Sequence, residues 1–219
     1  ALAYVRRWQL LDKVAFVGSW TLYALAQASG GRGMMFATTI FVLFGSLPYL
    51  RSVVRGRPSQ RVDVIQMTTN AAVYYAVSFG NLSSDQTGPF TLTLSCVFLA
   101  QGLAVFVIAD GDRLLRLGTL GVAVGLFTLW ILLEANPTWL PALWAGEGLG
   151  LTLIGYRVHS GPTRLVGAGV VALSVVATLY SFEDFLPERS FGSEEAIVYV
   201  CVIAVLYAVA FVTSRLPAE

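Results

Sequence analysis

The chain has 219 residues, of which 56% are hydrophobic and only 12% are charged, and its mean hydropathy is +0.71. Soluble domains usually carry about 25% charged residues, so this composition excludes an ordinary soluble protein and favours a membrane protein. The formal net charge of +1 leaves no overall basic field that would recruit nucleic acid. The length suits about seven or eight membrane spans with short loops, without a separate soluble domain.

Eight apolar segments follow one another along the chain. They are continuous rather than alternating, and they are rich in Leu, Ala and Gly, which favours helices over strands. A helix also pairs every backbone group within its own segment, as a bilayer requires. We therefore predict an all-α fold, a polytopic bundle of about eight transmembrane helices that form one domain over 1–219. The predicted spans are 8–28, 34–49, 62–82, 90–109, 114–133, 138–156, 163–180 and 195–212.

The basic residues that flank these segments predict the orientation. With eight spans, twelve of the 14 Lys and Arg residues fall on one side of the membrane, and only Arg32 and Arg189 fall on the other. The positive-inside rule then places both termini in the cytoplasm. A miscount by one span would destroy this asymmetry. The twelve are Arg6, Arg7, Lys13, Arg51, Arg55, Arg57, Arg61, Arg113, Arg116, Arg157, Arg164 and Arg215.

The third span carries a line of polar side chains. Four of them recur at steps of three and four residues, which places them on one face of a helix. A polar stripe within a membrane helix must face protein or water rather than lipid. The four residues are Asp63, Gln66, Asn70 and Tyr74. Earlier in the chain, Asp12 and Lys13 are interpreted more simply as an ion pair at the membrane interface.

Glu147 stands at the midpoint of the sixth apolar segment. A lone carboxylate at that depth costs about 3 kcal/mol, so a compensating partner is expected. Ala142, Gly146 and Gly150 are spaced four apart and predict a ridge of small residues beside it. Such a ridge lets a neighbouring helix approach closely, which indicates that the carboxyl group turns into protein.

Two interpretations of these polar groups stay open. In the first, Glu147 and the third-span stripe are joined by Gln101 and Thr128 and line a narrow polar cavity for a solute, a proton or a cation. In the second, each group makes an interhelical hydrogen bond worth about 1 kcal/mol, and Glu147 is a clasp between helices.

Enzymatic chemistry finds little support in the sequence. No GxSxG or HExxH motif occurs, and no acids are paired at active-site spacing. The one histidine, His159, lies at a predicted loop edge, which leaves no internal pair of haem ligands. Cys96 and Cys201 lie in apolar stretches without a CxxC motif. We therefore predict no catalytic, cofactor-binding or metal-binding residues.

The predicted outer loop 181–195 carries five acidic residues and interleaved phenylalanines against a single Arg189. This composition is typical of a solvated loop whose aromatic side chains anchor at the lipid headgroups. An interfacial segment or a docking surface for a partner is the alternative.

The segment 137–160 resembles a recurring stretch in a family of bacterial multi-pass membrane proteins, the domain of unknown function 2339 family. Members often carry a Trp-x-x-Glu-Gly-type pattern on an apolar helix, followed by a glycine and a basic turn. Trp144, Glu147 and Gly148 match this pattern, and Gly155 and Arg157 follow it. The resemblance implies a polytopic protein of the bacterial inner membrane with no established activity. Family members are usually longer, so it also implies a short relative or a piece.

Together these features lead to three functional predictions. The first is a non-enzymatic integral membrane protein, a scaffold or accessory subunit that meets the lipid bilayer and other membrane protein subunits. The second is a small transporter or channel that uses Glu147 and the third-span stripe. The third, an enzyme acting on lipid, lacks a recognisable nucleophile and base.

Overall fold

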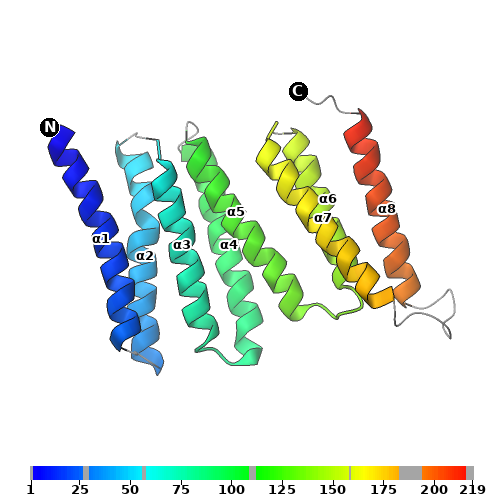
Figure 1. Ribbon diagram of the computed structural model, residues 1–219, viewed down its shortest axis with the longest axis horizontal. Helices are drawn as coiled ribbons and strands as arrows, with labels where there is room; N and C mark the ends of the chain where they lie inside the picture. Colours follow the sequence, from blue (N-terminus) through cyan, green and yellow to red (C-terminus); the bar gives the residue numbers. More distant parts are fainter. Residues whose placement is uncertain are drawn as a thin grey trace. The chain divides into compact units, whose positions relative to one another are not determined.

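The computed structural model describes residues 2–26, 30–55, 58–108, 112–157, 159–182 and 194–215. These stretches contain eight helices, joined where described by short turns, and no strand (Figure 1). The prediction of an all-helical chain is confirmed. The predicted outer loop lies mostly outside the described residues, which omit 183–193. The helices are α1 (Leu2–Ala26), α2 (Gly30–Arg55), α3 (Arg61–Phe79), α4 (Ser84–Ile108), α5 (Arg113–Glu134), α6 (Leu140–Arg157), α7 (Gly161–Phe182) and α8 (Glu194–Arg215).

Each predicted apolar segment overlaps one of these helices, but the boundaries differ. The predicted span 62–82 runs three residues past the end of α3 at Phe79, and 138–156 begins two residues before α6, whereas several other helices continue past the predicted ends. The clearest case is α2, which runs six residues beyond the predicted end at Tyr49 and so includes Arg51. Where a predicted span is shorter than its helix, the reason is that hydropathy detects only the apolar part of a helix, which suits the hydrocarbon core of a bilayer. The backbone hydrogen bonds of a membrane helix can continue into the polar headgroup region.

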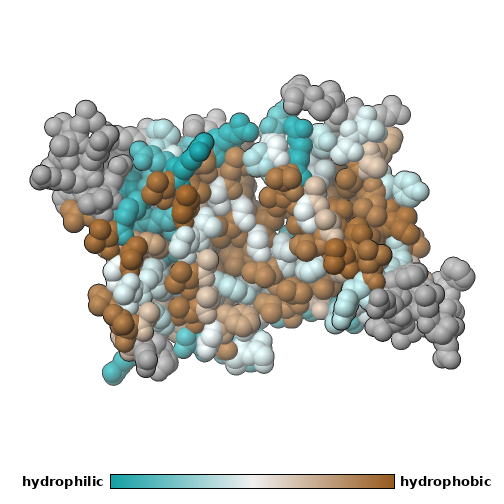
Figure 2. Space-filling view, in the orientation of Figure 1, coloured by the Kyte–Doolittle hydropathy of each residue, from teal (hydrophilic) through white to brown (hydrophobic). Residues whose placement is uncertain are grey.

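Among the described residues, five helices are long and apolar enough to cross a membrane, which suggests a membrane protein. They are α2, α4, α5, α7 and α8, through the segments Gly31–Ser52, Ser84–Ile108, Arg113–Glu134, Gly161–Tyr180 and Glu194–Ser214. In α1 and α3 the apolar character is interrupted by charged residues, among them Lys13 and Asp63. Figure 2 shows hydrophobic residues across the middle of each part of the molecule and hydrophilic residues gathered toward the helix ends.

The chain divides into two compact units, Ala1–Phe127 and Thr128–Glu219. The boundary falls within α5, so the last two turns of that helix belong to the second unit. The expectation of one domain over 1–219 did not include this division.

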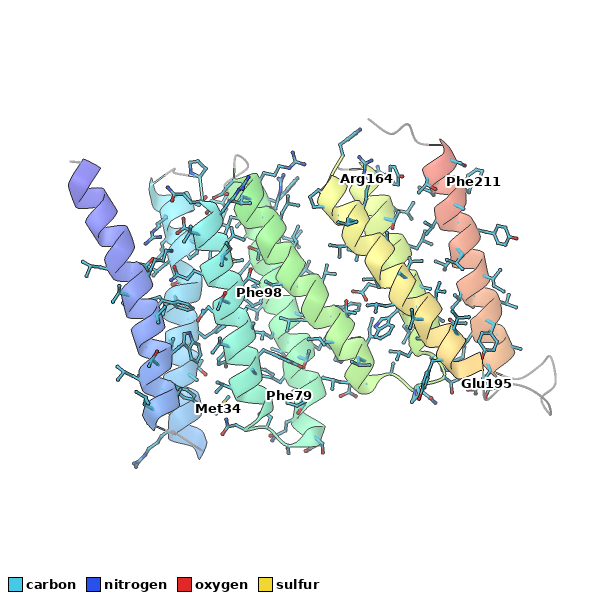
Figure 3. All side chains as sticks on the ribbon, viewed as in Figure 1. Met34, Phe79, Phe98, Arg164, Glu195 and Phe211 are labelled. Carbon is cyan, nitrogen blue, oxygen red and sulfur yellow. The ribbon has the colours of Figure 1, made fainter. Side chains whose placement is uncertain are left out.

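In the first unit, aromatic side chains from α1, α2, α3 and α4 form the centre of the core. Phe41 stacks on Tyr74 with ring centroids 4.3 Å apart, and it meets Phe98 edge-on at 6.0 Å. Phe98, labelled in Figure 3, is 2% exposed. On the α1 side, Phe16 meets Phe44 edge-on at 5.3 Å. These contacts fix α3 against α2 and α4, and so fix the position of the polar stripe.

In the second unit, α6 and α7 approach so closely that glycine is required at the contact. A methyl group added to Gly148 would lie 2.8 Å from the Gly167 carbonyl oxygen, and one added to Gly155 would lie 2.7 Å from the Arg164 nitrogen. These distances are shorter than any ordinary carbon contact, and the obstructing atoms belong to backbone that cannot swing away.

This contact corrects the predicted packing ridge. A methyl group added to Gly146 or Gly150 would meet nothing within 4 Å. Ala142 instead packs beside Ala145 in a small cluster with α8. Small residues lie on both faces of α6, and the sequence does not distinguish which face a neighbouring helix uses.

The turn between α6 and α7 has a Schellman geometry. The nitrogen of His159 donates to the Tyr156 carbonyl at 3.2 Å, and that of Ser160 donates to the Gly155 carbonyl at 2.8 Å. His159 has the left-handed φ of 51° that this motif needs. The hydroxyl of Ser160 then accepts from the hydroxyl of Thr163 at 2.8 Å, so the helix ends and the next begins within three residues.

Candidate functional site

All four predicted stripe residues of α3 are buried, with Asn70 at 0% exposure. Each makes at least one hydrogen bond with a group on another helix of the first unit. The stripe therefore faces protein, as its position in an apolar helix requires. The residues are Asp63, Gln66, Asn70 and Tyr74.

At one end of the stripe, Asp63 joins a compact network of two acids and two bases. Its Oδ1 accepts from Lys13 Nζ and from Arg51 Nη1, each at 3.0 Å. Arg51 Nη2 also donates to Asp12 Oδ2 at 2.9 Å, and Lys13 lies 3.5 Å from the same atom. Both carboxylates are about 10% exposed or less. The network is neutral overall and links α1, α2 and α3.

Gln66 extends this network by accepting a hydrogen bond from Lys13 through Oε1. The second oxygen of Asp63 accepts from the backbone nitrogen of Gln60 at 3.1 Å, which places the carboxylate at the N-terminus of α3. A negative charge is favourable there because the helix dipole presents its positive end. Asp12 and Lys13 are therefore more than the interfacial pair predicted, since they bind both other helices.

Further along the stripe, Asn70 uses both ends of its amide group. Its Oδ1 accepts from the indole nitrogen of Trp20 at 3.1 Å, and its Nδ2 donates to the Phe41 carbonyl at 2.9 Å. Tyr74 forms a hydrogen bond with the hydroxyl of Thr38 at 3.0 Å. These partners come from α1 and α2, so the middle of the stripe is a seam between helices.

Gln101 belongs to a second polar cluster of the first unit. Its Oε1 accepts from the hydroxyl of Tyr49 at 3.1 Å, and that hydroxyl is 2.9 Å from Thr119 Oγ1. The cluster joins α2, α4 and α5. Gln101 and the stripe thus belong to the first unit, whereas Thr128 and Glu147 belong to the second.

Asp112 holds two connections of the first unit together. Its Oδ2 accepts from the backbone nitrogen and the hydroxyl of Ser59, at 2.8 and 2.7 Å, and its Oδ1 accepts from the nitrogen of Leu115 at 3.1 Å. Burial acts to raise the pKa of Asp112, but the hydrogen bonds from Ser59, Leu115 and Ser52 outweigh it and hold the pKa below its ordinary 3.8. The α2–α3 and α4–α5 connections therefore lie at the same end of the unit.

Glu147 in the second unit is paired through one oxygen only. Its Oε1 accepts from Thr128 Oγ1 at 2.8 Å. Its Oε2 is buried and has no hydrogen-bond partner among the described residues. Trp144, one turn earlier on α6, directs its indole nitrogen toward the Thr128 carbonyl at 3.5 Å. Thr128 thus contacts both Glu147 and Trp144 of α6.

The part of the chain that the structure describes brings no three His, Cys, Asp or Glu side chains together in a group that could hold a metal ion. Cys96 and Cys201 are free and exposed. Comparisons of the chain with models of known protein families, with curated proteins and with solved structures found no match.

Sequence reasoning missed one central residue of the polar network, Arg51. The sequence places it in a loop, because the predicted span ends at Tyr49. The signal that could have found it is helical spacing: Arg51 follows Phe44 and Ser52 follows Pro48 on continuous faces of α2. A basic residue within a turn of a span end can reach back toward an acid on a neighbouring helix.

Proposed function

We propose that the chain is a non-enzymatic integral membrane protein that serves as a scaffold or accessory subunit of a larger membrane assembly. The observation that carries the proposal is that the α3 stripe is buried and binds neighbouring helices. Asp63, Asn70 and Tyr74 use their polar atoms to bind α1 and α2. A solute path would need such groups to face water, whereas a rigid structural subunit needs them to hold helices together.

The proposal includes about eight spans. α3 has 19 residues and α6 has 18, which gives lengths of about 28 and 27 Å, close to the thickness of a bilayer core. The charges of α1 and α3 are paired with one another and with Arg51, so these helices can enter a membrane among more apolar neighbours.

The proposed orientation has both termini in the cytoplasm. Hydrogen bonds of Asp112 with Ser59 place Arg61 and Arg113 at the same end of the first unit, and the positive-inside rule assigns that end to the cytoplasm. The assignment to a bacterial inner membrane rests on the resemblance of Trp144, Glu147 and Gly148 to the domain of unknown function 2339 family.

Large apolar side chains on the outward surfaces support a role beside lipid or other subunits. On α8, Val200, Ile203, Tyr207 and Phe211 are all more than half exposed. Figure 3 shows Phe211 near one end of this helix. Such a surface is stable only against lipid or another apolar surface.

A small transporter or channel is the second candidate, and Glu147 is the observation that favours it. A buried carboxyl oxygen without a partner is costly in a structural helix, and intramembrane acids often bind ions or protons. The expected outcome for this candidate is loss of transport in Glu147→Gln with folding intact.

The assembly can be tested by extracting the protein gently from its native membrane into lipid nanodiscs and measuring the mass of the particle. The scaffold proposal expects the 23.6 kDa chain to travel with other subunits at fixed stoichiometry. If the chain is found alone or as a homo-oligomer, the scaffold proposal fails and the transporter becomes the function to test.

The topology can be tested with single cysteines in a background that lacks Cys96 and Cys201. If the chain has eight spans, a membrane-impermeant maleimide should label Ser83→Cys from outside the cell. It should label His159→Cys only after lysis. Both positions lie in turns between helices. Labelling of the two positions from the same side would contradict the eight-span arrangement.

A further inference from the structure

We infer that Glu147, together with Thr128 and Trp144, forms an exchangeable proton-binding site within the second unit. The inference deepens the second candidate function by naming the proton as the species bound. It does not depend on whether the chain also serves as a scaffold, because the test measures the chemical modification of the Glu147 carboxyl group itself.

The two oxygens of Glu147 have unequal surroundings. Oε1 accepts a 2.8 Å hydrogen bond from Thr128, while Oε2 is buried without a partner among the described residues. A carboxylate shares its negative charge over both oxygens, so an unsolvated Oε2 makes the ionised form costly. A proton on Oε2 removes the charge while Oε1 keeps its hydrogen bond. The geometry therefore accommodates the neutral acid.

The charged and titratable groups of the helices around Glu147 do not offer a nearby cation. On α7, residues 165–179 carry no charged or titratable side chain. Arg164 at the start of α7 lies over the Tyr156 ring at 4.6 Å, and Tyr156 is nine residues from Glu147, about 14 Å along α6. The remaining such groups on α5, α6 and α8 in the second unit are Glu134, Arg157, Glu194, Glu195, Tyr199, Cys201, Tyr207 and Arg215.

The donor set favours a proton over a metal cation. Calcium takes about six to eight oxygen ligands and magnesium about six. The hydrogen bonds at this site involve the Glu147 carboxylate, the Thr128 hydroxyl and the Thr128 carbonyl, and Trp144 already donates toward that carbonyl. The Thr128 hydroxyl donates its proton to Oε1, so its oxygen is the single uncharged ligand that it could offer to a cation. A proton needs a single oxygen, and Oε2 supplies it.

Lipid-soluble reagents can approach the site. Glu147 is only half-buried as a residue, and neighbouring Gly146 is exposed with open space where a side chain would lie. A hydrophobic carbodiimide dissolves in the bilayer and reacts with protonated carboxyl groups. The acid proton moves to one carbodiimide nitrogen, and the carboxyl oxygen bonds to the central carbon. The resulting adduct rearranges to a stable N-acylurea, with no leaving group and no oxidant.

The test treats the intact protein in nanodiscs with dicyclohexylcarbodiimide and locates the adduct by peptide mass spectrometry. We expect a single major adduct at Glu147, whose rate of formation falls at least tenfold as the pH is raised through the titration of the group. We expect Glu134, an exposed acid on α5, to remain unlabelled at neutral pH, and Glu147→Gln to abolish the adduct.

The variant Thr128→Val tests whether the hydrogen bond from Thr128 controls the protonation of Glu147. Loss of the hydrogen bond to Oε1 disfavours the carboxylate, so the variant should label faster at a given alkaline pH and its profile should move to higher pH. A pH profile that does not move would show that Thr128 does not position the group and would overturn that part of the site. Since valine matches threonine in shape, folding should be preserved.

Two further outcomes would overturn the inference. Protection of Glu147 by sodium chloride, but not by choline chloride at equal ionic strength, would identify a sodium site instead of a proton site. The absence of both the adduct and a protonated-carboxyl infrared band that Glu147→Gln removes would show that the group is ionised. The particle mass is unaffected by these results, so failure here is distinct from failure of the scaffold proposal.

Discussion

The α3 stripe and Glu147 place polar side chains in similar apolar helices, yet their surroundings differ. Asp63 contacts two cations, and Asn70 satisfies both ends of its amide group. Glu147 has one oxygen satisfied and one without a partner. The comparison separates polar side chains that bind neighbouring helices from a carboxyl group that keeps one buried oxygen unpaired.

The two units also differ in what holds their helices together. In the first unit, α1, α2 and α3 are joined by ion pairs and side-chain hydrogen bonds. In the second, α6 and α7 are joined by backbone approach at Gly148, Gly155 and Gly167. Substitutions that remove polar partners should therefore act mainly on the first unit, and substitutions that add volume should act mainly on the second.

The largest effect is expected from Asp63→Ala. It leaves Lys13 and Arg51 sharing Asp12 alone, and loss of one partner from a largely buried ion network costs about 3 to 5 kcal/mol. Equilibrium unfolding in mixed detergent micelles measures the change. Asp85→Ala is the matched control, because Asp85 is exposed at the start of α4, so its loss should have a much smaller effect on the free energy of unfolding. Equal effects of the two substitutions would contradict the network's role.

A smaller effect is expected from Gly148→Ala. The added methyl group would lie 2.8 Å from the Gly167 carbonyl oxygen, and overpacking of this kind costs about 1 to 3 kcal/mol. Gly146→Ala is the control on the same helix, where the methyl group meets nothing within 4 Å. The control should be neutral or stabilising by up to about 1 kcal/mol, since alanine favours helix. Thermal unfolding of the two variants side by side distinguishes these outcomes.

Asp112→Asn should cost about 1 to 3 kcal/mol, because Asp112 accepts hydrogen bonds from Ser59 and Leu115 that an amide cannot fully replace. The folded-state pKa of Asp112 lies below its ordinary 3.8. The stability that Asp112 contributes is therefore present above pH 3.8 and is lost as the pH falls through the lower folded-state value. Unfolding curves of both proteins should converge at acid pH, and a constant difference at every pH would contradict this.

The smallest effect on stability is expected from Glu147→Gln. The amide oxygen can keep the hydrogen bond from Thr128, and an amide is as neutral as the protonated acid and close to it in shape, so the change should stay within about 1 kcal/mol. Unfolding under the same conditions as for Asp63→Ala gives the direct comparison. A loss as large as that of Asp63→Ala would show that Glu147 is a structural clasp.

Hydrophobic patterning was sufficient to predict the eight helices, because a membrane helix must be apolar along its whole buried length. Three- and four-residue spacing likewise predicted that Asp63, Gln66, Asn70 and Tyr74 share one face of α3, which the structure buries. These are properties of a single helix, and they can be obtained from local sequence.

Contacts between helices could not be predicted in the same way. The partners of Asp63 lie 50 and 12 residues away on other helices, and nothing local specifies them. The α6 ridge was placed at Gly146 and Gly150 instead of Gly148 and Gly155, since both sets have helical spacing and only the neighbour's position separates them.

The central claim is that the α3 stripe is packed against protein and is not reached by water. Hydroxyl-radical footprinting of the unmodified protein in nanodiscs tests this claim most directly. Radicals formed from water oxidise side chains that water touches. We predict that Met67 and Tyr74, which are buried on α3, stay unoxidised while Trp139, exposed in the turn before α6, is oxidised rapidly. Oxidation of Met67 and Tyr74 at rates near that of Trp139 would place water along the stripe and contradict the account.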